Sequence, residues 1–400
     1  MATRVAKIAD RTLPSIPDPG ERSRLHLNGM SARSSLTTFL GSRSFVAVAL
    51  AAHLLFLFAI YRTQGIITDL EAEKYIGAAA DLLNGDAHDL LHRYPGYGMY
   101  VLFLVPFTLL GDVRLAIIAQ ILLGLWAAWA LRALVLRLTG SNAWAQLGGA
   151  LLLLSYVVHS WTLTLFSEPL ISALGIVLIE RATRPGNRFP WPVLLLMPVV
   201  LFARPIGILF VAPIAAYLLL RHRTWPGWVL PTGAVALFVL QLLLPMDRET
   251  VIVPIVQGEV VYGFPQWAGA AEDFDGRTIA GAQVELIQQH GIWVAAKLAV
   301  QKVLTFFHLT RPFFSTAHNA ALVLHYPVYL FAAIGLFKPR GTEQNIVLAV
   351  LALHIAVFSL TYLEWHGRFM APVWPLLLML AMLGGQRALR GDVLPKRDPQ

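Results

Sequence analysis

The sequence predicts an all-α, polytopic integral membrane protein with about ten to twelve transmembrane helices and further helices at the outer membrane face. The chain is 57% hydrophobic and only 14% charged, whereas a soluble chain of 400 residues needs more charge to cover its surface. Apolar runs recur at the length of about 17 to 25 residues that crosses a bilayer. Cysteine is absent, which excludes disulfides and thiolate chemistry and leaves the compartment open.

Charge alternates between the apolar runs and predicts their orientation. Two loops are acidic, over residues 62–97 and 246–290, and the other loops carry basic clusters. The basic residues are Arg132, Arg137, Arg181, Arg184, Arg188, Arg221, Arg223, Lys338, Arg340, Arg387, Arg390, Lys396 and Arg397. The positive-inside rule therefore places both acidic loops outside. The net charge of +8 is then a topology signal, which excludes nucleic acid as a partner.

The chain divides into a tail, a membrane domain and a second tail. Residues 1–43 are basic and rich in proline and serine, which predicts a disordered cytoplasmic tail. Residues 44–386 form the membrane domain, with 61–112 and 246–318 as its two outer loops. Residues 387–400 form a cytoplasmic tail. We expect a multi-pass protein of the bacterial cytoplasmic (inner) membrane, with its site facing the periplasm or exterior.

Ten apolar segments are predicted to cross the bilayer. They are 44–61, 113–131, 143–159, 168–180, 191–203, 205–220, 227–244, 319–337, 345–362 and 369–383. Two further segments fit poorly as crossings, because 97–110 contains Pro106 and 292–308 carries Lys297 and Lys302. We expect both to be outer-face or half-buried helices.

This topology brings polar residues from distant segments to the outer face. They are Asp69, Glu71, Glu73, Lys74, Tyr75, His88, His92, Arg93, Tyr94, Tyr97, Glu168, Arg204, Glu364, His366 and Arg368. Ionisable groups at a bilayer are costly, so their default interpretation is functional. Their convergence on one face is typical of a site built on a helical scaffold.

Each candidate also has a purely structural interpretation. Glu71, Glu73 and Lys74 are expected to form a solvated helix face. Asp69 precedes that helix and is a candidate N-cap. Glu168 precedes Pro169 at a helix start, although glutamate is a poor N-cap.

The two arginines and the nearby histidine are harder to interpret. Arg204 and Arg368 lie on the outer side, against the charge rule, where a snorkelling arginine is the alternative. A structural role for them as ion-pair partners of Glu168 and Glu364 also stays open. His366 is equally compatible with an interface residue and a ligand.

The order of the motifs resembles the C-type membrane glycosyltransferases, the GT-C superfamily, and within it the mannosyltransferase-like family 39. The motifs are TDLEAEKYIGAAADLLNGD (68–86), YPGYG (94–98), SEPL (167–170), RPIG (204–207) and HGRFMAPVWP (366–375). The resemblance covers the layout from about residue 44 to residue 383, and each motif is short and degenerate. Such enzymes take sugars from polyprenyl-phosphate carriers.

The resemblance implies roles for individual residues. Asp69 is implied as the catalytic aspartate and Glu168 as the second acidic position. Arg204 and Arg368, with His366, are implied near the carrier phosphate. We expect the substrate-binding residues among Glu73, Tyr75, His92, Arg93, Tyr94 and Tyr97. Many members carry a soluble domain after the last span, whereas this chain has a short tail there, so acceptor recognition is expected from the outer loops.

The chemistry of the outer face agrees with this reaction. Nucleotide sugars are absent outside the cytoplasm, so the donor must be a lipid-linked sugar, whose reacting bond lies at headgroup depth. Arginine stabilises a leaving phosphate through bidentate contacts. An attacking hydroxyl needs a positioned base, for which Asp69 is the candidate. The expected partners are a polyprenyl-phosphate-linked sugar donor, a lipid, glycan or protein acceptor, and membrane lipids.

Other functions stay open. A lipid-linked oligosaccharide polymerase or ligase also uses outer-face arginines, but on a long loop rich in Arg and His, whereas loop 246–318 is acidic. A lipid-linked sugar transporter or flippase would carry charge near span centres. No cofactor is required by the sequence, but Asp69, Glu168 and His366 could gather around Mg²⁺, Mn²⁺ or Zn²⁺.

Overall fold

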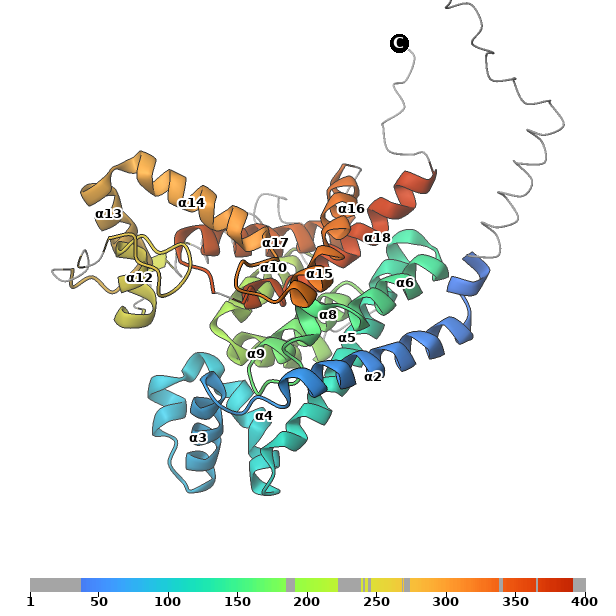
Figure 1. Ribbon diagram of the computed structural model, residues 1–400, viewed down its shortest axis with the longest axis horizontal. Helices are drawn as coiled ribbons and strands as arrows, with labels where there is room; N and C mark the ends of the chain where they lie inside the picture. Colours follow the sequence, from blue (N-terminus) through green and yellow to red (C-terminus); the bar gives the residue numbers. More distant parts are fainter. Residues whose placement is uncertain are drawn as a thin grey trace, which may run out of the picture.

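The computed structural model describes residues 37–184, 191–221, 246–267, 274–337, 341–364 and 366–390, with a few isolated residues between them. Within these ranges the chain is helical and contains no β-strand. The helices are α2 (Arg43–Gln64), α3 (Glu71–Leu83), α4 (Gly98–Leu109), α5 (Ala116–Thr139), α6 (Asn142–Leu153), α7 (Tyr156–His159), α8 (Glu168–Ala182), α9 (Trp191–Ala203), α10 (Ile208–Arg221), α12 (Val253–Val256), α13 (Ile279–His290), α14 (Ile292–Phe307), α15 (Thr316–Val323), α16 (Tyr326–Leu336), α17 (Thr342–Leu360) and α18 (Trp374–Arg390) (Figure 1). Most of tail 1–43, the predicted crossing 227–244 except three isolated residues, and residues 391–400 lie outside the described residues.

Among the residues that the structure describes, four helical stretches are long and apolar enough to cross a membrane, which indicates a membrane protein. They are Arg43–Gln64, Val113–Thr139, Thr316–Leu336 and Thr342–Leu360. The predicted number of ten to twelve crossings is not reached by this measure, because several apolar runs form shorter helices. The run 143–159, for example, forms two helices, because α6 ends at Leu153 and the four-residue α7 follows it.

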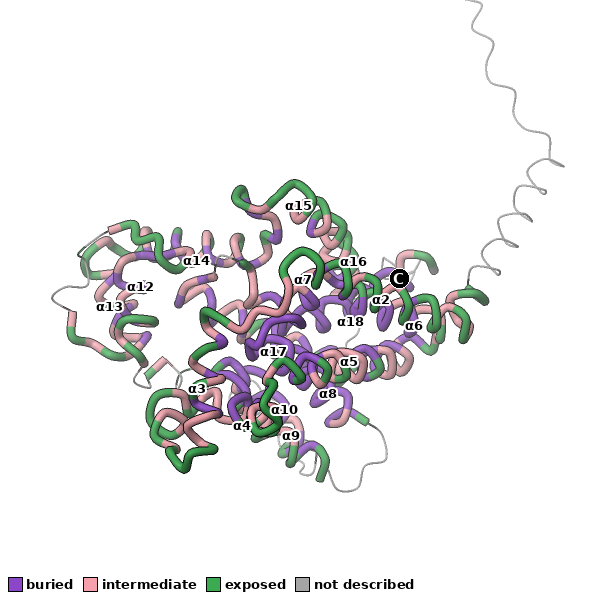
Figure 2. Tube along the Cα trace, turned by 60° about the horizontal axis from the view of Figure 1, so that its bottom comes forward, coloured by how far each residue is buried: buried purple, intermediate pink, exposed green. Residues whose placement is uncertain are grey.

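The bundle is built around α8 and α18. Fourteen of the 15 residues of α8 are buried, and α18 is buried from Trp374 to Gln386 (Figure 2). Helix α16 packs directly on α18 at two glycines. A Cβ at Gly384 would meet the carbonyl oxygen of Phe331 at 1.8 Å, and one at Gly335 would meet that of Leu380 at 2.3 Å. Small residues therefore set this close helix packing, as is common between membrane helices.

The two outer loops fold into separate helical groups beside the bundle. The first loop forms α3 and α4, and the second forms α12, α13 and α14 (Figure 1). The predicted helices over 97–110 and 292–308 are thus present, as α4 and α14. Pro106 lies inside α4, one turn before its end.

Two isolated parallel β-bridges tie these loops to the bundle. Ile67 pairs with Thr164, through hydrogen bonds from the Ile67 amide to the Leu163 carbonyl and from the Leu165 amide to the Ile67 carbonyl, both 3.0 Å. Val261 pairs with Leu363, and the Tyr262 amide donates to the Leu363 carbonyl over 2.8 Å. Each bridge lies within four residues of a charged residue at the same end of the bundle.

The other end of the bundle carries its own ion pairs. Arg137 Nη1 lies 2.9 Å from Glu180 Oε1 and its Nε lies 3.9 Å from Glu343 Oε1. Arg181 Nε lies 3.4 Å from Glu180 Oε2. These residues join the C-termini of α5 and α8 to the N-terminus of α17. We call this the Arg137 end.

The second outer loop buries two opposite charges. Lys302 of α14 is 1% exposed and Glu259 is 4% exposed. Burial lowers the pKa of Lys302 to about 8, with Glu259 acting in the opposite direction. Burial also raises the pKa of Glu259, while the Gly263 N–H and Lys302 act to lower it. For both groups, desolvation outweighs the mutual attraction.

We therefore expect the double variant Lys302→Met/Glu259→Gln to be more stable than the wild type at neutral pH. Both charges are disfavoured by burial, and replacing opposite buried charges by neutral groups of similar volume is often stabilising by about 1 to 4 kcal/mol. The glutamine keeps an oxygen for the Gly263 N–H, which Glu259 Oε2 accepts at 2.7 Å. The measurement is the apparent melting temperature in detergent. Lys297→Met, at an exposed position of the same helix, is the control and should change it little.

Candidate functional site

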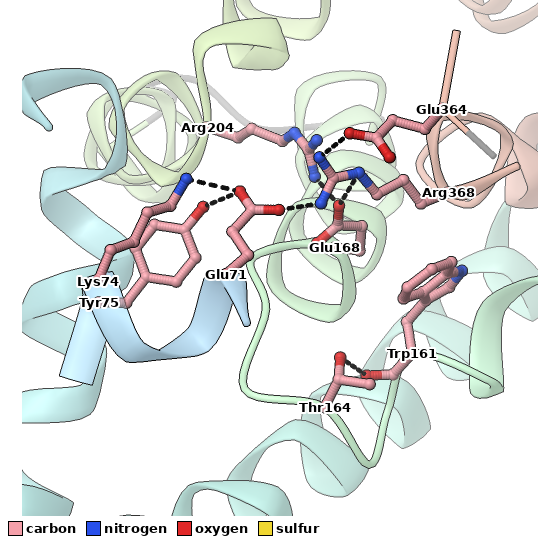
Figure 3. Close-up of polar contacts among 9 residues, drawn as sticks. All are labelled: Glu71, Lys74, Tyr75, Trp161, Thr164, Glu168, Arg204, Glu364 and Arg368. Carbon is pink, nitrogen blue, oxygen red and sulfur yellow. Dashed lines mark hydrogen bonds and ion pairs between the residues drawn. The ribbon is translucent and has the colours of Figure 1, made fainter. Parts of the chain in front are cut away.

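A group of charged side chains gathers at the end of the bundle opposite to the Arg137 end (Figure 3). We call it the charge cluster, and it consists of Glu71, Lys74, Glu168, Arg204, Glu364 and Arg368. Its members come from the start of α3, the start of α8, the residue after α9, and the segment between α17 and α18. Residues nearly 300 positions apart in the sequence thus make direct contact, since Arg368 pairs with Glu71.

Glu168 and Arg204 form the buried centre of the charge cluster. Their side chains are 1% and 4% exposed, and Arg204 Nη1 donates to Glu168 Oε1. Glu168 is the first residue of α8, with Pro169 behind it and Ser167 at the N-cap. It is therefore not an N-cap, although a carboxylate in a first helical turn is favoured by the helix dipole. Glu168 Oε2 is buried and has no hydrogen-bond partner in the described part of the chain.

Arg368 links three carboxylates. Its Nη1 donates to Glu71 Oε2, its Nη2 donates to Glu364 Oε1, and its Nε lies 3.5 Å from Glu168 Oε1. Gly367 has φ 67°, a left-handed conformation that glycine adopts without strain, and it turns the chain into the short 3₁₀ helix Arg368–Met370. The bridge at Leu363 fixes the other side of Glu364.

Glu71 belongs to the charge cluster, so the prediction of a solvated face for Glu71 and Lys74 is wrong. Lys74 Nζ and the Tyr75 hydroxyl donate to Glu71 Oε1 over 2.8 and 2.7 Å. Lys74 also lies over the ring of Tyr97, at 4.9 Å from its centroid. Glu73 is exposed, as predicted. The sequence does show which face of α3 is buried, because Ala72, Tyr75, Ala78 and Ala79 are apolar and recur with helical period.

Opposite charges balance within the charge cluster. Three carboxylates face two guanidinium groups and one ammonium group, so the formal charges sum to zero. Burial raises the pKa of Glu71, but the attraction of Arg368, Arg204 and Lys74 outweighs it and holds that pKa well below its usual value of 4.5. The guanidinium Cζ atoms of Arg204 and Arg368 both lie over the ring of Phe369, at 5.3 and 5.6 Å from its centroid.

Asp69 lies just outside the charge cluster. It is exposed, and within the described ranges no hydrogen bond or ion pair engages its carboxylate. Leu70 is the N-cap of α3, so Asp69 does not cap that helix. Leu70 is also the one non-glycine with positive φ among the described residues, at 57°. Such strain of about 1 kcal/mol persists where surrounding structure enforces it, often at functional sites.

The remaining predicted residues divide into two groups. Tyr75 is buried beneath Glu71, and Tyr94 and Tyr97 lie around Lys74. By contrast, His92 and Arg93 are exposed on a short helix, where Arg93 Nη1 lies 3.4 Å from Asp89 Oδ2. Within the described residues, neither side chain makes a direct contact with a member of the charge cluster.

His366 is exposed and stacks with an aromatic ring. Its ring lies parallel to that of Phe314, with centroids 5.9 Å apart, and Trp161 stands edge-on to it at 6.4 Å. Asp69, Glu168 and His366 do not gather into a metal site. No group of three or more His, Asp or Glu side chains suited to a metal ion occurs in residues that the structure describes.

Comparisons with known proteins add no relative. A scan against protein-family models found no match, and neither did searches of curated proteins and of solved structures.

The charge cluster should make stability sensitive to acid. Because the pKa of Glu71 is lowered by folding, its contribution is fully present above pH 4.5 and is lost as pH falls below that value. We expect Glu71→Gln to lower the free energy of unfolding at neutral pH by about 1 to 3 kcal/mol. It should also flatten the loss of thermal stability between pH 5 and pH 3, measured by melting in detergent. Glu73→Gln, at an exposed position of the same helix, is the control; an equal effect of both variants would contradict the assignment.

Proposed function

We propose that the protein is a membrane glycosyltransferase that moves a sugar from a polyprenyl-phosphate carrier to an acceptor at the outer face of the membrane. One observation carries this proposal: the charge cluster assembles two arginines and three carboxylates from four distant segments at one end of an apolar helical bundle. Charge at the ends of helices, not at their centres, favours chemistry at a membrane surface over transport through the bundle.

Arg368 is the residue that we propose for the carrier phosphate. Its side chain is 14% exposed, whereas that of Arg204 is 4% exposed and covered by Glu168. Each of its three nitrogens faces one oxygen of a different carboxylate, and such oxygens resemble those of a phosphate in negative charge and in accepting charge-assisted hydrogen bonds. A phosphate arriving beside Arg368 can therefore exchange with Glu364, whose side chain is 20% exposed. Arg204 then acts as a positioning residue that keeps Glu168 and Arg368 in place.

Asp69 is the residue that we propose as general base. It is two residues from Glu71, which contacts Arg368, and its carboxylate is exposed to an incoming acceptor. In the reaction the acceptor oxygen attacks the anomeric carbon, and the bond from that carbon to the phosphate oxygen breaks. The electron pair leaves with the lipid phosphate beside Arg368, and the hydroxyl proton passes to Asp69. A single displacement of this kind inverts the anomeric configuration.

Asp69→Asn should lower the turnover number by about 10²- to 10⁴-fold, because the amide cannot accept the hydroxyl proton. Binding of a polyprenyl-phosphate-linked hexose should stay near the wild-type value. The assay follows transfer of labelled hexose by purified protein in detergent or nanodiscs. Asp275→Asn is the matched control, since it makes the same change at an exposed aspartate outside the charge cluster. Near wild-type turnover of Asp69→Asn would remove Asp69 as the base.

Arg368→Ala should raise the KM for the polyprenyl-phosphate donor by about 10- to 100-fold, the effect of losing charge-assisted hydrogen bonds. Arg368→Lys should recover part of this loss, since lysine keeps the charge and lacks the planar fork. Arg204→Ala should instead lower the melting temperature, because it leaves Glu168 buried without its partner, at a cost of about 3 to 5 kcal/mol. Arg114→Ala, an exposed arginine before α5, is the control. An unchanged donor KM in Arg368→Ala leaves Arg368 a purely structural residue.

A further inference from the structure

A pocket lies in the second outer loop, apart from the charge cluster. Its volume is about 390 Å³, and its walls come from the segment 260–266 and from the end of α14 with the following turn. Among the residues that line it are Val260, Val261, Phe264, Gln266, His308 and Phe313. Pockets of about 300 to 1,000 Å³ with mainly apolar walls and a few polar groups are typical small-molecule sites.

The walls of this pocket are held by contacts of the protein itself. Arg311 donates to the carbonyl oxygens of Thr305 (3.2 Å), His308 and Thr310 (3.1 Å), which fixes the turn after α14. Thr305 lies in the last turn of α14 and the other two residues follow the helix, so the arginine bonds the helix end to the turn after it. On the other wall, Glu259 Oε2 holds the Gly263 N–H. The pocket is therefore shaped before any ligand arrives.

The pocket adjoins the segment that carries Glu364, His366 and Arg368. The Phe313 ring lies 6.1 Å from the ring of His366, which is two residues before Arg368. Val261 forms the β-bridge with Leu363, the neighbour of Glu364. A ligand in this pocket would thus contact Val261 and Phe313, which in turn contact the short segment that contributes to the charge cluster.

The chemistry of the walls fits an uncharged ring with an apolar face and polar edges. Phe264 and Phe313 are each 50% exposed, and the C–H face of a pyranose packs against such rings. Gln266, His308 and Thr305 supply hydrogen-bonding groups for hydroxyls. The residues that line the pocket, all within the described ranges, include no carboxylate, so the pocket is not suited to a cation.

We propose that this pocket binds a sugar ring of the acceptor, which makes the acceptor a glycan or glycolipid. The role of this sugar as an acceptor rests on the proposed glycosyl transfer, but sugar binding itself can be measured without turnover. Phe264 and Phe313 would select the acceptor, while Arg368 would hold the donor.

The test is saturation-transfer NMR of the purified full chain in nanodiscs with four probes: the methyl pyranosides of α-mannose, α-glucose, β-galactose and β-xylose. We expect at least one probe to receive saturation, with affinity about fivefold weaker in Phe313→Leu and in Phe264→Leu, the worth of one aromatic contact. Phe337→Leu is the matched control, because Phe337 is equally a surface phenylalanine, 76% exposed, beyond the C-terminus of α16. Saturation of no probe, or equal saturation in all variants, overturns the proposal.

A transfer assay then separates this inference from the proposed function. Where transfer occurs, Phe313→Leu should raise the acceptor KM and leave the donor KM unchanged, and a change in neither KM overturns the acceptor assignment. Where sugar binds at the pocket and transfer from polyprenyl-phosphate donors fails, the glycosyltransferase proposal is wrong and the pocket remains a sugar-binding site.

Discussion

The arrangement of this end of the protein depends on one constraint, the need to neutralise arginines inside an apolar bundle. A guanidinium group with little access to water is stable only beside carboxylates that satisfy its donors. Arg204 therefore requires Glu168, and Arg368 requires Glu71 and Glu364. Glu168 and Glu71 come from segments other than those of the arginines that they neutralise, so the charge requirement itself draws the first loop, α8 and the segment before α18 together.

The length of α8 sets the distance between the charge cluster and the Arg137 end. Glu168 and Glu180 belong to opposite charged ends and are separated by twelve residues, or about 18 Å along a helix. The hydrocarbon core of a bilayer is about 30 Å thick. The two charged ends are therefore closer together along α8 than the two faces of a flat hydrocarbon core, and the charge cluster itself is largely buried in protein. Ionic contacts there are stronger than in water, since the effective dielectric constant is lower.

Much of the helical layout was predictable, because apolar runs of helical length recur in the sequence. Nine of the ten predicted crossings coincide with described helices or helix pairs, although only four such stretches are long enough to span. Glu168, Arg204 and Arg368 were also found in advance, since charge beside an apolar run is conspicuous. The role of Glu71 was missed, because its partner Arg368 lies 297 residues away and no spacing in the sequence shows that contact. The two β-bridges leave no sequence signal, since each joins a single pair of residues.

Those bridges connect the two halves of the proposed chemistry. In the pair Ile67–Thr164, Ile67 lies two residues before Asp69 and Thr164 lies four residues before Glu168. The pair Val261–Leu363 lies beside Phe264 and beside Glu364. Each bridge thus fixes a residue of one of these loops against a residue that lies one to four positions before a member of the charge cluster. A displacement of the second loop by an acceptor would act directly on Glu364, the carboxylate that shares Arg368 with the carrier phosphate. In the proposed reaction, donor and acceptor binding would therefore be coupled through the short segment that carries Leu363, Glu364 and Arg368.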